Sequence, residues 1–129
     1  MKHIRDALCA FAALCMLWAA PARAAEPITI GLGMALTGGL AAVGKSGLLA
    51  MQIWAENVNA KGGLLGRPVK LVYYDDQSNP ATVPGIYTKL IEVDKVDLVI
   101  SGYATNMVAP AMPIVMQKTD QVCGTFLCR

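Results

Sequence analysis

Hydrophobic residues along this chain follow two periods that alternate from one segment to the next. Short apolar runs of the kind that form buried strands occupy residues 28–34, 69–74 and 96–100. Each run is followed by a stretch with helical spacing, over residues 40–60, from residue 80 onward, and over about residues 106–116. Strands that alternate with helices predict an α/β fold, in which a parallel sheet with right-handed crossovers is flanked by helices in three layers.

The helical spacing also predicts which side chains face the sheet. In the first helix, Leu49 and Ile53 recur at i, i+4, and beside them lie Ala50, Trp54 and Val58. We therefore expect this apolar stripe to be buried, with Trp54 in the core.

Prolines mark weak points in the two later helices. We expect the second helix to have Asn79 as its cap and Pro80 at its first position, with an irregular start because Pro84 follows soon after. Pro110 and Pro113 lie within the third helix and disturb its regularity. The core face of the second helix is expected to consist of Val83, Ile86, Leu90 and Ile91.

Ligands of such sheets bind beyond the carboxyl ends of the strands, which here are followed by turns at residues 36–44, 75–79 and 101–106. The first turn is rich in glycine and precedes a helix, so its N–H groups and the helix dipole favour an anion, either phosphate or carboxylate. Asp75 and Asp76 in the second turn suggest a metal ligand or an acid/base pair. No second carboxylate cluster and no histidine beyond His3 supports that chemistry, so we favour a strand-end pair that contacts water or a helix.

The first 24 residues have the three parts of a secretory signal peptide. Basic residues near Met1 precede an uncharged run at residues 7–20, and Ala22 and Ala24 form an Ala-x-Ala cleavage site. The uncharged run has 14 residues, whereas a membrane-spanning anchor needs roughly 20. We expect cleavage after Ala24 and export of the protein.

Without this leader, the chain would have eight basic and eight acidic residues among 105. A neutral chain has no basic field for nucleic acid or an anionic membrane, so neither is expected as a partner. Cys123 and Cys128 are the two cysteines that remain, and either a local disulfide or two free thiols fits them. Two thiols are too few to hold zinc, and no cofactor is predicted.

The first turn also matches the phosphate-loop pattern, with Gly39, Gly44, Lys45 and Ser46 at the required spacing. Residues 71–75 could supply the apolar strand and acid that help to hold magnesium. However, the interior of the loop includes leucine and valine, which suit a tight phosphate cradle poorly, and exported proteins generally meet no ATP.

Four segments in order resemble the type I periplasmic solute-binding proteins of ABC importers, the Leu/Ile/Val-binding family. These segments are residues 30–44, 57–69, 74–80 and 99–106. The resemblance implies that residues 25–117 form part of the N-terminal lobe of that two-lobed fold. It further implies a periplasmic protein, not an enzyme, which captures an amino acid or a related small carboxylate or amide and delivers it to an ABC permease in the inner membrane.

The same resemblance implies a site. In the family, the first lobe holds the carboxylate of the solute through backbone N–H groups and a hydroxyl in the turn after the third strand. That hydroxyl falls on Thr105, with Tyr103, Ala104 and Asn106 in the same turn, while Val43 falls where family members place a wall against the ligand. Thr105 could instead be only the N-cap of the third helix, and Val43 a plain core or surface contact.

Residues 118–129 do not resemble the corresponding segment of the family, although residues 122–128 could form a short strand. We interpret this tail as the product of a truncation or a frameshift. Such a chain would have an incomplete sheet and would bind solute weakly or undetectably. The alternatives to a transport function are the ligand-sensing module of a receptor, which shares the fold, and a nucleotide-binding protein with a phosphate loop.

Overall fold

The computed structural model describes residues 25–118 and 126–128 of the 129-residue chain. The predicted leader and Cys123 lie outside these residues. The elements follow one another as β1 (Ile28–Met34), α2 (Ala41–Ala60), β2 (Val69–Asp75), α3 (Val83–Glu92), β3 (Leu98–Ile100), α4 (Thr105–Lys118) and β4 (Phe126–Cys128). The predicted alternation of strands and helices is therefore confirmed.

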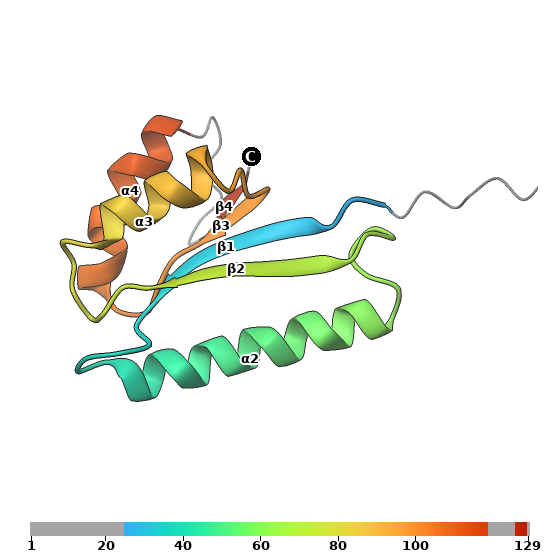
Figure 1. Cartoon of the computed structure of the whole chain (residues 1–129), viewed down its shortest axis with the longest axis horizontal. Coiled ribbons are helices and arrows are strands. Elements are labelled where there is room, and N and C mark those ends of the chain that lie inside the picture. The colour runs from blue at the N-terminus through green and yellow to red at the C-terminus, as the bar shows by residue number, and fades with distance from the viewer. Residues whose placement is uncertain (1–24, 119–125, 129) are drawn as a thin grey trace, which may run out of the picture.

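The sheet has the strand order β2-β1-β3-β4, and β1 pairs in parallel with both β2 and β3. Figure 1 shows α2 on one face of the sheet and α3 and α4 on the other, which is the expected three-layer arrangement. The tail supplies a strand, as its sequence allowed, but β4 runs antiparallel to β3. Within the described ranges, no helix has both the length and the apolar composition that a membrane crossing requires.

The two faces of β1 are packed differently. Its large side chains, such as Ile30 and Leu32, face α2 and form the core on that side. The opposite face carries Gly31 and Gly33, and a Cβ atom at Gly31 would lie 2.8 Å from a methyl group of Val96. The missing side chains let α3 and the segment before β3 lie close to the central strand.

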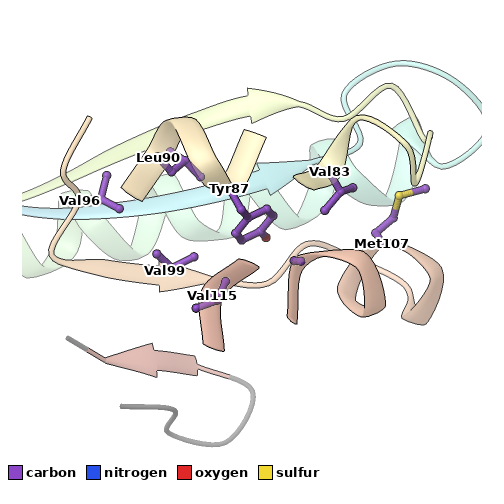
Figure 2. Packing of buried hydrophobic residues seen from close by; sticks show 8 residues of the cluster. Val83, Tyr87, Leu90, Val96, Val99, Met107 and Val115 are labelled. Carbon is purple, nitrogen blue, oxygen red and sulfur yellow. The ribbon is translucent and has the colours of Figure 1, made fainter. Parts of the chain in front are cut away.

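The larger core cluster lies between the sheet and the pair α3 and α4. Figure 2 shows that its side chains come from α3, β3 and α4 and from the segment between α3 and β3. Tyr87 lies within this cluster and is only 1% exposed. Its hydroxyl donates to the carbonyl oxygen of Ile100 at 2.8 Å. Because that hydrogen bond ties α3 to the last residue of β3, the core also positions the turn that follows β3. The labelled members of the cluster are Val83, Tyr87, Leu90, Val96, Val99, Met107 and Val115.

The predicted buried face of α2 is wrong except at Val58, which is half-buried and packs against the core cluster around Ile28 and Ile30. Leu49 is 57% exposed and Trp54 is 40% exposed, whereas the buried positions are Gly44, Leu48 and Ala55. Small residues at two of these three positions let the helix approach the sheet closely, so the bulkier side chains face outward. Trp54 therefore does not belong to the core.

The predicted start of the second helix is also wrong. Asn79 and Pro80 belong to a turn, in which the side chain of Asn79 accepts a hydrogen bond from the N–H of Ala81 at 3.0 Å. The helix begins only at Val83, with Thr82 at its N-cap position. Pro84 then falls in the first helical turn, where a missing N–H group costs nothing, because that group would have no partner within the helix.

The connection between α2 and β2 is held by its own polar groups. The side chain of Asn59 accepts from the N–H of Val69 at 2.7 Å and donates to its carbonyl oxygen at 2.9 Å. Gly63 has φ +84, and a Cβ atom there would collide with the carbonyl oxygen of Arg67. These contacts explain why asparagine stands at position 59 and glycine at position 63.

Candidate functional site

The turn after β1 is held by a carboxylate from the neighbouring strand. One oxygen of Asp75 accepts hydrogen bonds from the backbone N–H groups of Leu36 at 2.9 Å, Thr37 at 3.1 Å and Gln77 at 2.8 Å. Its other oxygen accepts from the hydroxyl of Thr37 at 2.7 Å. The anion that part of this turn binds is thus a side chain of the protein itself.

These hydrogen bonds determine the charge state of Asp75. Burial raises the pKa of its carboxyl, but the donors from Thr37, Gln77 and Leu36 outweigh burial and lower the pKa from 3.8 to about 2. Asp75 is therefore ionised throughout the neutral pH range and fixes the first turn against the second.

Ser78 adds a second link between the same two turns. Its hydroxyl donates to the carbonyl oxygen of Thr37 at 2.7 Å and accepts from the N–H of Leu40 at 3.0 Å. The backbone at Gln77 and Ser78 has φ +58 and φ +57, a left-handed conformation that brings the Ser78 side chain back toward the first turn. The sequence did not reveal this role of Ser78, because a serine near a proline is common in turns of many kinds.

The side chain of Asp76 is buried and makes different hydrogen bonds from that of Asp75. Its residue is 1% exposed, and one carboxylate oxygen accepts from the N–H of Ser78 at 2.9 Å. Burial raises the pKa of this carboxyl, the Ser78 donor opposes that effect, and the charge of Asp75 raises the pKa further. A Cβ atom on Gly102 would lie 3.6 Å from the other oxygen of Asp76 and 2.7 Å from the carbonyl oxygen of Gly33. The turns after β2 and β3 therefore meet at the end of β1.

Polar groups are left available at the turn after β3. The helix α4 begins at Thr105, so the position before it is Ala104, whose carbonyl oxygen accepts from the N–H groups of Met107 at 3.0 Å and Val108 at 3.1 Å. The N–H groups of Thr105 and Asn106 take no part in the hydrogen bonds found among the described residues, and neither does the Thr105 hydroxyl. The alternative in which Thr105 is only an N-cap is therefore wrong, since Ala104 occupies that position.

The residues predicted for the site lie in two parts of the molecule. Tyr103, Thr105 and Asn106 are exposed around the start of α4, and Ala104 among them has the unusual value φ +80. Val43 is 44% exposed in the first turn of α2, which lies on the opposite face of the sheet (Figure 1). Four of the five residues are thus consecutive around the start of α4, and Val43 lies apart from them.

The phosphate-loop pattern does not form a phosphate loop. The helix α2 starts at Ala41, so most of the residues between Gly39 and Gly44 are already helical. Lys45 and Ser46 are exposed, and the Ser46 hydroxyl donates to the carbonyl oxygen of Ala42 one turn earlier at 3.0 Å. A helix with these side chains on its outer surface has no cradle for a nucleotide phosphate.

Metal chemistry also finds no support in the described part of the chain. No group of three or more histidine, cysteine, aspartate or glutamate side chains comes together there. Asp75 and Asp76 are adjacent in sequence, but their hydrogen bonds are directed to different turns.

The arrangement defines a class of protein: a parallel α/β unit whose strand-end turns are cross-linked by hydrogen bonds and leave N–H groups and a hydroxyl open at one helix start. This is the kind of edge at which open α/β sheets bind small ligands. The sequence agrees, because the model of the periplasmic binding protein family matches residues 27–124. The chain belongs to that family of solute-binding proteins.

Individual relatives narrow the comparison. The chain is 30% identical over 105 residues to Leu/Ile/Val-binding protein homolog 2 of Brucella abortus (strain 2308). The matched region covers 81% of this chain and 28% of that relative. A branched-chain amino acid transporter substrate-binding protein of Streptococcus pneumoniae, solved in complex with isoleucine, has a TM-score of 0.69 and 27% identity over 72% of this chain and 27% of its own. A fatty acid ABC transporter substrate-binding protein of Thermomonospora curvata has a TM-score of 0.66 and 30% identity over 72% of this chain and 23% of its own. The chain thus spans about a quarter of the length of these proteins.

Proposed function

We propose that this chain provides the carboxylate-binding part of an extracytoplasmic solute-binding protein of an ABC importer. The observation that carries the proposal is the group of unused donors at the start of α4, namely the N–H groups of Thr105 and Asn106 and the Thr105 hydroxyl. These donors lie at the positive end of a helix dipole, where a carboxylate is stabilised. Tyr103 and Ala104 form the adjoining backbone.

The solute would be an amino acid or a related small carboxylate. Two similar structures support this class of solute. One was solved in complex with isoleucine, and the other is named as a fatty acid transporter protein. Isoleucine and a fatty acid have a carboxylate in common and differ in the rest of the molecule. The family and the predicted leader support a periplasmic location, and the importer relatives support an ABC permease as partner. Val43, on α2, would then contact the solute only if the solute extends past the end of β1.

A titration followed by NMR tests the proposal. With ¹⁵N-labelled protein, isoleucine should shift the amide signals of Thr105 and Asn106, whereas 2-methylbutylamine, which lacks only the carboxylate, should not. We expect weak binding, because this chain spans about a quarter of its relatives and would leave much of the solute in water. Thr105→Val should weaken it about tenfold through loss of one hydrogen bond to a charged group.

Ser46→Ala is the matched control, because it also removes an exposed hydroxyl near a helix start, on α2. It should leave the response to isoleucine unchanged. Amide shifts that appear with ATP around Lys45 and Ser46, or equal shifts with the amine and the amino acid, would contradict the proposal.

A further inference from the structure

An apolar seam runs along the outer surface of α2. At its centre Leu49 is 57% exposed and Ile53 is 50% exposed, and Trp54 beside them is 40% exposed. Figure 1 shows that α2 lies alone on its face of the sheet among the described elements, and its inner side packs against β1 and β2. Large apolar side chains that are exposed side by side on one helix face indicate an interaction surface.

The seam has the spacing of a two-helix contact. Its positions are separated by four and three residues in alternation, as in the seam of a coiled coil. These positions are Ala42, Ser46, Leu49, Ile53, Glu56 and Ala60, all exposed. The seam is thus apolar at its centre, has alanine at both ends, and has one polar residue on each side of the centre.

The same positions are symmetric about residue 51. Leu49 and Ile53 lie two residues on either side of it, Ser46 and Glu56 lie five, and Ala42 and Ala60 lie nine. An antiparallel helix of the same sequence, related by a two-fold axis at residue 51, would therefore set Leu49 against Ile53 of the other copy. A two-fold contact needs a self-complementary surface of this kind.

The charges on this face agree with the same arrangement. Lys45 lies in the N-terminal half of α2 and Glu56 in the C-terminal half. In the antiparallel pair, Glu56 of one copy lies opposite Ser46 of the other and so beside its Lys45. Both charges gain an opposite neighbour, twice in each dimer. A parallel pair would instead place Lys45 beside Lys45.

We propose that α2 is a homodimer interface, in which two copies of this chain pair through antiparallel α2 helices. The interface is separate from the turn at Thr105, because α4 lies on the other face of the sheet (Figure 1). Solute binding and pairing can therefore be tested independently.

Sedimentation equilibrium of the purified chain over a range of concentrations tests the pairing. The wild-type chain should form a dimer, and Ile53→Lys should raise the dissociation constant on the order of a hundredfold, because it puts a charge at the centre of the seam in both copies. Val93→Lys is the matched control, since Val93 is 69% exposed at the end of α3, away from the seam. It should leave the dimer unchanged, and circular dichroism should show both variants to be folded.

Charge exchange tests the direction of the helices. Lys45→Glu and Glu56→Lys should each weaken the dimer about tenfold, because each turns two attractions into repulsions. A mixture of these two variants, or the double variant K45E/E56K, should restore wild-type affinity. If the single changes have no effect, the antiparallel arrangement is wrong.

Two further results would overturn the proposal. One is a monomer at every concentration, in which case hydrogen exchange at α2 would show whether other residues of the same chain cover the seam. The other is a dimer that Ile53→Lys does not weaken, which would place the contact on another surface. In either case the response of Thr105 and Asn106 to isoleucine is expected to persist, so the two proposals fail separately.

Discussion

Asp75 and Asp76 are adjacent in the sequence, and the fold changes their acidities in opposite directions. The pKa of Asp75 is lowered to about 2 by its hydrogen bonds, while that of Asp76 is raised chiefly by burial. Alternation along the end of a strand directs one side chain to the first turn and the other inward. The two residues therefore make opposite contributions to the pH dependence of stability.

For Asp75, we expect stabilisation that is lost in acid. Between pH 3.8 and about 2 the folded carboxyl binds fewer protons than the unfolded one, so its contribution is complete above about pH 4 and disappears as the pH falls toward 2. Asp75→Asn should lower the free energy of unfolding at pH 7 by about 1–2 kcal/mol, since Asn cannot satisfy the same donors. Urea unfolding of both proteins should show the difference shrinking over that acidic range. A difference that stays constant with pH would contradict this role.

For Asp76, the expected sign is reversed. Above pH 3.8 the folded carboxyl binds more protons than the unfolded one, so stability is lost as the pH rises through the raised pKa of the folded state. Asp76→Asn keeps an acceptor for the N–H of Ser78 and removes the buried charge. The variant should be more stable than the wild type at pH 7 and equal to it near pH 3, as measured by urea unfolding. Lower stability of the variant at pH 7 would show that the ionised carboxylate is required.

Single residues were predictable where their role is local. The exposed turn from Tyr103 to Asn106 follows from its place between a strand and a helix, and the structure places it there. The contacts of Asp75 with Leu36 and Thr37 join residues 39 and 38 positions apart. No pattern within one segment contains that information, so the binding of the first turn by this carboxylate could only come from the structure.

At the scale of elements, α2 shows why periodicity identified a helix but chose the wrong face. Apolar residues lie on two sides of this helix, with Leu48 and Ala55 on one and Leu49 and Ile53 on the other. Periodicity favours the side with larger residues. The side with small residues packs against the sheet instead, because Gly44 lets the helix lie close to the end of β1.

Two glycines of α2 provide a direct test of this packing. A Cβ atom at Gly44 would collide with the carbonyl oxygen of Ala35, whereas one at Gly47 would make an ordinary contact of 3.7 Å with Met34. Gly44→Ala should therefore destabilise the protein by about 2–4 kcal/mol through backbone displacement. Gly47→Ala should stabilise it by about 0.5–1 kcal/mol through helix propensity. Thermal or urea unfolding measures both, and equal effects of the two substitutions would show that α2 does not rest on Ala35.

At the scale of the whole molecule, the order of strands and helices was predictable because the two periods are distinct and each segment is long enough to show one of them. The direction of the last strand was not predictable. Three residues that pair with β3 carry no sequence signal for parallel or antiparallel pairing, and the choice depends on where the chain returns after α4. Because β4 is antiparallel, Phe126 pairs with Ile100, the last residue of β3. The turn of the proposed site follows directly after Ile100.

β4 should therefore protect the short strand β3. Because β3 has only three residues, its pairing with β1 alone leaves one edge open to water. Removal of residues 119–129 should raise amide hydrogen exchange in Leu98–Ile100 about tenfold or more, since local opening becomes easier. Amides between β1 and β2 serve as the internal control and should change little, because those strands pair over seven residues each. If exchange in β3 is the same with and without the tail, the four-stranded sheet does not persist in solution, and the turn at Thr105 is positioned by the Tyr87 hydrogen bond and the α3–α4 core instead.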